Sequence, residues 1–376
     1  MTRRTTWHGY CVSRSQSTTG ITCDGSLILT KIFVFEYLTG GGIDPQVAGA
    51  GSLADLSALI VEGRVMRDAL VADLREVEGV QVSYASSRFE SAGADAGAVR
   101  HVAEPGEPMT RFVARIAREH DYAWIVAPEC DGLLLRLYDA VGASRWLGCS
   151  KESIRVTSSK SATAACLAAR GIVTTPALEP YAATAVDGGK WVVKPDDGAG
   201  GLDTYVFDDL GHAVAEYEAR AEAGRNPVLQ QWIDGEPLSL SLLCGERGAT
   251  LLSINRQRIG LPDAAAEGRN ERVVEFSGVD IDRIDRRGVQ GRTLDALAQR
   301  VVAALPGLRG FAGIDLVWHR ERGPVVIEVN PRLTVAYAGQ SRVQKHNLAR
   351  DLLAAHGVAG FEADAQPRFR AFGGLS

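Results

Sequence analysis

The segment from Phe311 to Arg332, FAGIDLVWHRERGPVVIEVNPR, predicts two apolar strands joined by the polar turn RERG. Because side chains alternate across a strand, Glu328 and Asn330 must point to the same face. The turn would bring Asp315 alongside them from the first strand. Two carboxylates and one amide are oxygen ligands of the kind that Mg²⁺ prefers, so the segment predicts a magnesium nucleotide site. The alternative is a hairpin whose polar residues simply face water.

Length and composition predict a modular globular protein. A chain of 376 residues exceeds one ordinary core, and 45% hydrophobic with 23% charged residues is typical of globular proteins. A net charge of −5 gives no sign of the basic surface that binds nucleic acid. No apolar run near the start reaches the roughly 20 residues of a membrane span, and no secretory signal is evident. We therefore expect a cytoplasmic protein with small-molecule partners, no nucleic acid and no membrane. The oligomeric state stays open, a homodimer included.

The first 150 residues divide into two parts. Residues 1–26 are rich in Ser, Thr and Arg and are expected to be a disordered extension. Residues 27–150 alternate between strand and helix patterns, which predicts a small parallel α/β domain. The expected strands span 27–38, 80–84 and 122–128, and the expected helices span 53–77, 109–119 and 133–141. Ligands gather at the carboxyl ends of such strands, so Glu36 and Gly41 are candidate substrate residues. The alternative for the glycines here is a tight turn.

Two lysines further along the chain lie in a predicted helix and at the end of a predicted strand. An Ala-rich helix expected at 158–170 carries Lys160 in its first turn, and a strand at 191–193 runs into Lys194. Three glycines follow in the next loop: Gly198, Gly200 and Gly201. Such glycines let backbone N–H groups approach phosphate closely, although no Gly-Lys-Ser/Thr ends the loop as in a Walker A motif. A lone glycine-rich loop is more often a surface turn, but its place between Lys160 and the acidic strands favours phosphate binding.

The order of these motifs, with a spacing of thirteen and two residues among the metal ligands, resembles the ATP-grasp superfamily over roughly residues 145–345. The resemblance implies an α/β (α+β) ATP-grasp fold behind a Rossmann-like pre-ATP-grasp domain, with subdomains at 151–245 and 246–376. It implies ATP with Mg²⁺, or Mn²⁺ as an alternative, and phosphate contacts from both lysines. The implied adenine hinge consists of Gln230, Gln231, Trp232 and Ile233. Glu236 is the implied ribose ligand, although many members place that acid one residue later, where this chain has Pro237.

The resemblance also implies an acyl-phosphate mechanism that ends in an amide. Catalysis of this kind rests on positioning and charge neutralisation, so the lysines and metal ligands carry it. Many amide-forming members have an arginine where this chain has Gly313, so Arg332 and Arg256 are the candidates for stabilising anions. The alternative for Arg332 is an ion pair with a surface acid. For Arg256 it is plain exposure on the cationic face of a strand.

Several segments, among them QQWIDGEPLSLSLL and EVNPRLTVAYAG, resemble the tyramine–glutamate ligase group of methanofuran-type and methylofuran-type cofactor biosynthesis. That resemblance implies a glutamate γ-carboxylate joined to tyramine or tyrosine. Arg332, Thr334 and Tyr337 would line the acceptor pocket, and Arg256 would hold the glutamate α-carboxylate. The alternative for Tyr337 is a packed core aromatic. The rival functions are another ATP-grasp chemistry (peptide ligase, carboxylase or kinase) and a nucleotide-binding regulator without turnover.

Overall fold

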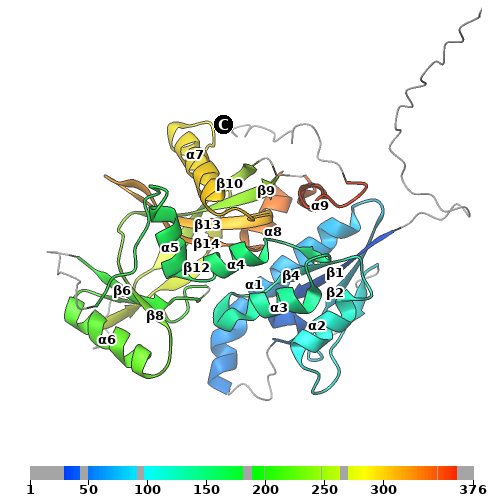
Figure 1. The fold of residues 1–376 in the computed structure, drawn as a ribbon, viewed down its shortest axis with the longest axis horizontal. Helices are drawn as coiled ribbons and strands as arrows, with labels where there is room; N and C mark the ends of the chain where they lie inside the picture. Colours follow the sequence, from blue (N-terminus) through cyan, green and yellow to red (C-terminus); the bar gives the residue numbers. More distant parts are fainter. Residues whose placement is uncertain are drawn as a thin grey trace, which may run out of the picture.

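The computed structural model describes residues 29–42, 50–90, 97–180, 189–198, 200–246, 248–262, 270–344 and 346–361 (Figure 1). The predicted extension at 1–26 lies outside these residues. Three sheets organise the described part of the chain. The N-terminal sheet and the sheet that carries β6 and β8 lie at opposite ends of the molecule in Figure 1. None of the helices within the described ranges is long and apolar enough to cross a membrane.

The N-terminal sheet is parallel, with the order β3-β2-β1-β4-β5. Its strands are β1 (Thr30–Glu36), β2 (Val80–Ala85), β3 (Val99–His101), β4 (Tyr122–Val126) and β5 (Trp146–Leu147), with helices α1 (Ala50–Arg75), α2 (Met109–Ala117) and α3 (Leu133–Val141). The last five residues of β1 are all buried, as expected for a strand covered on both faces. The predicted parallel α/β domain is confirmed. Because β1 lies between β2 and β4, its carboxyl end is at the point where the strand order reverses.

A second, four-stranded sheet carries the order β11-β7-β6-β8. It consists of β6 (Trp191–Pro195), β7 (Tyr205–Phe207), β8 (Pro227–Gln231) and β11 (Glu271–Val273), and α6 (Leu210–Glu222) packs on it. A small core of buried residues, including Trp191, Val193 and Leu229, joins this helix to the sheet. Lys194 therefore lies near the end of a rigid strand, directly before the glycine-rich loop.

The third sheet is antiparallel, with the order β12-β10-β9-β13-β14. Its strands are β9 (Glu236–Gly245), β10 (Gly248–Gly260), β12 (Glu275–Asp280), β13 (Gly310–His319) and β14 (Gly323–Asn330). Helix α7 (Val289–Ala304) packs on β9 and β10, and α8 (Ala336–Gln344) and α9 (Leu348–Ala355) follow the hairpin. Because β9 pairs with both β10 and β13, this sheet extends across the predicted boundary at residue 245, and β11 returns to the second sheet. The two sheets are interleaved in sequence.

The helix predicted at 158–170 is α5 (Lys160–Ala168), and it is preceded by a short helix that the sequence did not predict, α4 (Lys151–Thr157). Ser159 separates them because its hydroxyl oxygen accepts a hydrogen bond from the backbone N–H of Ala162, which caps α5. The predicted end at Gly171 is confirmed, since this glycine has a φ of 67°. Lys160 is thus the first residue of its own helix.

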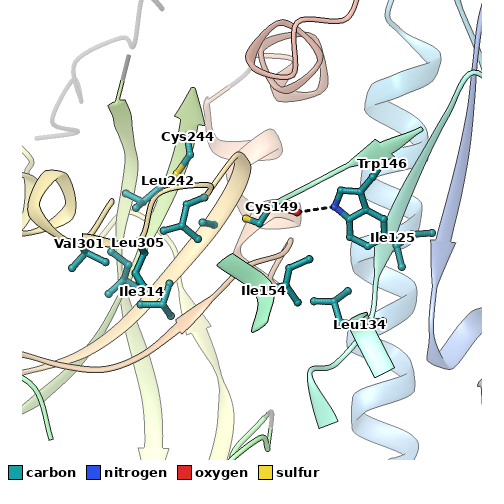
Figure 2. Close-up of a cluster of buried hydrophobic side chains, with 14 of the residues drawn as sticks. Ile125, Leu134, Trp146, Cys149, Ile154, Leu242, Cys244, Val301, Leu305 and Ile314 are labelled. Carbon is teal, nitrogen blue, oxygen red and sulfur yellow. Dashed lines mark hydrogen bonds between the residues drawn. The ribbon is translucent and has the colours of Figure 1, made fainter. Parts of the chain in front are cut away.

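One hydrophobic core crosses from the N-terminal domain into the antiparallel sheet. Figure 2 shows Ile125, Leu134 and Trp146 of the former near Ile154, while Leu242 and Ile314 of the latter belong to the same buried cluster. A second cluster joins α1 to α8 and α9. The N-terminal domain is therefore packed against the rest of the chain over a continuous apolar surface.

Candidate active site

The hairpin of β13 and β14 brings the three predicted metal ligands together. Asp315 pairs directly with Glu328 in the register, and Gly313 pairs with Asn330. The side-chain amide of Asn330 donates to Asp315 Oδ2 at 3.0 Å. A β-bulge falls at Ile327, next to Glu328, where such irregularities re-aim side chains. Across the described residues, no three His, Cys, Asp or Glu side chains form a metal cluster, so the oxygen set here is two carboxylates and one amide.

Both predicted lysines lie beside the acidic pair. Lys160 Nζ is 3.4 Å from Glu328 Oε2 and also donates to the carbonyl oxygen of Gly198. Asp196 ties the two lysine-bearing elements together: its carboxylate accepts from the hydroxyl of Ser159 at 2.6 Å and from the N–H of Ser161 at 2.8 Å. The first turn of α5 is therefore fastened to the residues that follow Lys194.

The positive and negative charges of this cluster compensate one another only in part. Burial and the positive charge of Lys160 lower the pKa of Lys194 to about 8. Burial, together with the neighbouring Glu328 carboxylate, raises the pKa of Asp315 well above its ordinary value. Burial would also raise the pKa of Glu328, but Lys160 and Lys194 hold it below its usual range. Asp315 also accepts from Gln257 Nε2 at 3.0 Å, so neutral donors supply part of its stabilisation.

These side chains line a cavity of about 430 Å³ between the second and third sheets. The glycines and the hinge segment predicted from sequence also line it: Gly198, Gly200, Gly201, Gln230, Gln231, Trp232 and Ile233. Gly200 and Gly201 have φ values near 70°, a conformation that favours glycine. Several apolar residues that the sequence analysis did not single out complete the walls: Val192, Ile259, Val274, Phe276 and Leu316. The cavity therefore has apolar walls and a cluster of charged side chains, Lys160, Lys194, Asp315 and Glu328, which we call its floor.

Arg332 reaches the cavity while held by a partner from the N-terminal domain. Its guanidinium forms two hydrogen bonds with the carboxylate of Glu129, at 3.0 and 3.1 Å. Both side chains are largely buried, at 14% and 6% exposure, so the predicted alternative of a surface pair does not describe this contact. Thr334 also lines the cavity, as predicted. A bidentate pair of this kind fixes the plane of the guanidinium.

Two predicted residues face away from the cavity. Arg256 is half exposed and forms an ion pair with Glu236 at 2.5 Å, and neither side chain lines the cavity. The physical reason is strand alternation, because Gln257 and Ile259 of β10 point inward and Arg256 therefore points outward. The catalytic and substrate roles of Arg256 and the ribose role of Glu236 therefore stay predictions, which these orientations do not support.

Tyr337 is a core residue. Its side chain is fully buried, its hydroxyl donates to Asp73 Oδ2 at 2.6 Å, and its ring packs edge-on against Phe311. It lies on the face of α8 that meets α1, so the prediction that it lines the acceptor pocket is wrong. The alternative weighed for this residue, a packed aromatic, describes it.

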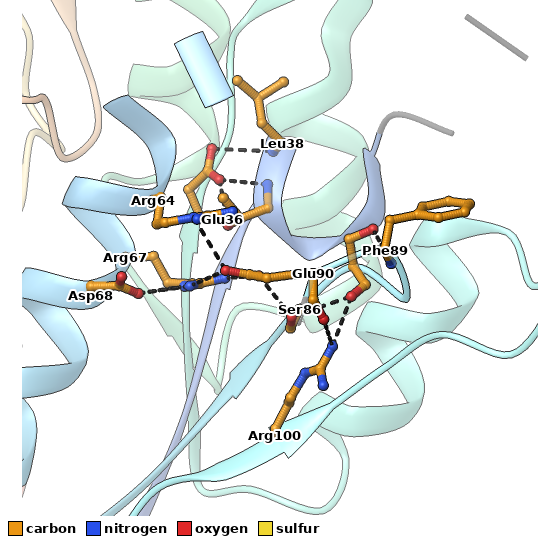
Figure 3. A network of polar contacts seen from close by, with 11 residues as sticks. Glu36, Leu38, Arg64, Arg67, Asp68, Ser86, Phe89, Glu90 and Arg100 are labelled. Atoms are coloured by element: carbon orange, nitrogen blue, oxygen red, sulfur yellow. Dashed lines mark hydrogen bonds and ion pairs between the residues drawn. The ribbon is translucent and has the colours of Figure 1, made fainter. Parts of the chain in front are cut away.

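Glu36 and Gly41 have structural positions at the end of β1. Glu36 is 3% exposed, and its carboxylate accepts from the N–H and the hydroxyl of Thr39 at 2.8 and 2.7 Å (Figure 3). Gly41 has a φ of 96° within the helical turn that follows. Neither residue lines the cavity, so the geometry favours a tight turn stabilised by Glu36 over the predicted substrate contacts.

The fold and this site define a class of protein. Residues 81–154 match the pre-ATP-grasp domain family and residues 157–336 match the ATP-grasp domain family, so the chain carries a pre-ATP-grasp domain followed by an ATP-grasp domain. It is similar to the tyramine–L-glutamate ligase of Methanocaldococcus jannaschii, with 27% identity over 325 residues, covering 84% of this chain and 88% of that protein.

Two crystal structures show the same fold. The first is of an ATP-grasp superfamily protein from Archaeoglobus fulgidus, with a TM-score of 0.60 and 24% identity over 87% of this chain and 88% of that one. The second is of the D-alanine–D-alanine ligase from Bacillus anthracis, with a TM-score of 0.55 and 17% identity over 87% and 97% of the respective chains. These likenesses confirm the predicted fold class.

Proposed function

We propose that this protein is an ATP-dependent ligase that joins the γ-carboxylate of glutamate to the primary amine of an arylalkylamine, tyramine or tyrosine, and releases ADP and phosphate. The observation that carries the proposal is the cluster of Lys160, Lys194, Asp315 and Glu328 on the floor of a cavity that also has apolar walls. The curated relative that covers most of the chain is named for glutamate and tyramine, which supports these two substrates.

The acidic residues suit a divalent cation of the hard, oxygen-seeking kind. Asp315 and Glu328 are adjacent carboxylates whose mutual repulsion a cation would relieve, and Asn330 adds a neutral oxygen donor. These three side chains would hold Mg²⁺ or Mn²⁺. When bound, such an ion neutralises charge on the triphosphate and orients its oxygens.

The remaining cavity residues divide into a phosphate part and a base part. Lys160, Lys194 and the glycine-rich loop would bind the phosphates, since cations and backbone N–H groups at close range stabilise anionic oxygens. The strand around Gln230 to Ile233 and the apolar residues opposite it would bind adenine. The partly lowered pKa of Lys194 would return toward its ordinary value when phosphate arrives, because the anion favours the charged form.

The reaction would proceed in two displacement steps. An oxygen of the glutamate γ-carboxylate attacks the γ-phosphorus of ATP, and the bond to ADP breaks to leave an acyl phosphate. The ammonium group of the acceptor loses one proton to solvent, and the resulting amine nitrogen attacks the acyl carbon. Phosphate departs with its bonding electrons, and the nitrogen loses a second proton to solvent to give the amide. Arg332, held in place by Glu129, would stabilise the oxyanion that forms at the acyl carbon.

A phosphate-release assay with ATP, Mg²⁺, glutamate and tyramine or tyrosine tests this proposal, followed by mass spectrometry of the product. We expect phosphate release that requires both substrates and a product with the mass of the glutamyl amide. Bicarbonate-dependent turnover would indicate a carboxylase, and a stable phosphorylated product would indicate a kinase. Absence of phosphate release across a panel of carboxylates and amines would favour a nucleotide-binding regulator and contradict the proposal.

A further inference from the structure

Helix α1 of the N-terminal domain contributes a wall to the cavity. Glu62 and Met66 both line it, and because they are four residues apart they lie on one face of the helix. The same helix reaches the glycine-rich loop, since a Cβ atom placed on Gly200 would lie 3.6 Å from Cδ2 of Leu59. Residues 50–75 precede both segments matched by the domain families. This wall therefore lies outside the two segments that match the domain families.

Glu62 is a half-buried carboxylate with no partner of its own. Among the residues that the structure describes, none donates a hydrogen bond to it or forms an ion pair with it, and burial alone raises its pKa. The neighbouring cations of α1 are engaged elsewhere, because Arg64 and Arg67 both pair with Glu90. On the cavity floor, Lys160 lies beside Glu328 and Arg332 is bound to Glu129. A cationic ligand group would relieve the cost of keeping this half-buried carboxylate unpaired.

Apolar side chains line the cavity together with Glu62. Met66 lies one turn along the helix, and Leu202 of the glycine-rich loop and Val335 before α8 line the same cavity. A carboxylate that shares a cavity with such side chains, one of them a helical turn away, matches a ligand with an ammonium group on an apolar body, which is the chemistry of an arylalkylamine. The α-ammonium group of glutamate is the other cation that the reaction would supply, but glutamate has no apolar body to contact Met66.

We propose that this face of α1 is the subsite for the amine acceptor, with Glu62 binding its ammonium group and Met66 contacting its apolar part. The proposal rests on the ligase function above and deepens it. A fixed carboxylate at this position repels a second carboxylate on the ligand, so the subsite selects an amine without a neighbouring carboxylate. The enzyme should therefore prefer tyramine to tyrosine.

The variant Glu62→Gln tests this assignment, because it removes the charge and keeps the shape. We expect the KM for tyramine to rise about 10- to 100-fold, the range for a lost hydrogen bond to a charged group, with the KM values for ATP and glutamate within about twofold of wild type. The preference for tyramine over tyrosine, expected to be about tenfold or more, should shrink. Glu78→Gln is the matched control, since it removes an equal charge from an exposed position outside the cavity.

Calorimetric titration of tyramine into the full chain with ADP and Mg²⁺ gives a readout that needs no turnover. Weaker binding by Glu62→Gln than by wild type and by Glu78→Gln supports the subsite, even if no amide forms and the ligase proposal fails. Unchanged tyramine binding and KM in a folded Glu62→Gln protein overturn the subsite while leaving the ligase proposal intact. A selective rise in the KM for glutamate also overturns it, because it assigns Glu62 to the carboxylate donor. A wild-type protein that neither binds tyramine nor forms an amide overturns both.

Discussion

Two buried polar clusters in this protein are built on opposite principles. In the N-terminal domain, Arg67 donates to both oxygens of Glu90 at 2.6 and 2.8 Å, and Ser86 donates to the same carboxylate at 2.7 Å (Figure 3). The pKa of Glu90 is lowered to about 2 because these partners outweigh the effect of burial. In the cavity, by contrast, Asp315 and Glu328 lie side by side, and the pKa of Asp315 is raised.

The difference distinguishes a polar cluster that stabilises the fold from one that is arranged for a ligand. The first satisfies its charges within the chain, so little is gained by adding a ligand. The second keeps like charges adjacent and two lysines close together, an arrangement that is unfavourable until anions and a cation arrive. Substitutions in the two clusters should therefore separate activity from stability.

The largest effect is expected for Glu328→Gln. Loss of this carboxylate should lower the rate of phosphate release on the order of 10²- to 10³-fold, because charge stabilisation in a water-excluded site contributes that much. Without Mg²⁺ we expect a small decrease in the free energy of unfolding. The repulsion between Glu328 and Asp315 is removed, but Lys160 and Lys194 lose the counter-charge that lowers the pKa of Glu328. Steady-state kinetics and urea denaturation measure both. A variant that stays active would show that this cluster is not the reaction centre.

Glu129→Ala tests a contact that joins the domains. Arg332 would be left buried without its partner, so the free energy of unfolding should fall by about 3–5 kcal/mol, the usual cost of breaking a buried pair. Turnover should also fall, because the guanidinium would lose its fixed plane. Denaturation and kinetic assays at a temperature where the variant stays folded measure the two effects, with Glu78→Gln as the control. An unchanged free energy of unfolding would mean that the ion pair makes no net contribution to stability.

The cluster of Arg67 and Glu90 in the N-terminal domain predicts that stability depends on pH. The pKa of Glu90 is lower in the folded protein than its ordinary value of 4.5, so its stabilising contribution is present above about pH 4.5 and is lost as the pH falls toward 2. Glu90→Gln should thus cost about 2 kcal/mol of unfolding free energy at pH 7, and the difference from wild type should shrink between pH 5 and pH 3. Denaturation curves across that range measure it. A difference that grows on acidification would contradict the assignment.

The smallest effect is expected for Arg256→Ala. Its ion pair with Glu236 is half exposed, so removal should change the free energy of unfolding by less than about 1 kcal/mol and kcat/KM by less than about twofold. Kinetics with varied glutamate provide the sharpest measurement. A large rise in the KM for glutamate would restore the substrate role that the sequence predicted for this arginine.

Local patterns predicted the central part of the candidate site. The relation among Asp315, Glu328 and Asn330 follows from strand alternation and one short turn, both of which are visible within 16 residues of sequence. Lys160 and Lys194 were identified because each begins or ends a recognisable element. Helix α4 was missed, although Ser150 stands directly before it and serine is a typical N-cap residue.

Long-range contacts account for what the sequence did not predict. Arg332 and Glu129 are 203 residues apart, and nothing local pairs them. Strand alternation correctly predicted that Arg256 and Gln257 lie on opposite faces of β10. Which of the two faces meets the cavity depends on how the sheets pack. Likewise, Tyr337 faces α1 rather than the cavity because of the contact between α1 and α8, and the same packing brings Glu62 to the cavity wall.

The apolar cluster of Figure 2 limits how this chain can be shortened. Ile125, Leu134 and Ile154 lie outside the segment 157–336 that matches the ATP-grasp domain, yet they belong to the same buried cluster as Leu242 and Ile314 within it. A fragment cut to that segment would expose the faces that these residues cover, and exposed apolar surface of that kind promotes aggregation. The nucleotide-binding half is therefore not a portable module, and engineering of this protein has to retain its N-terminal domain.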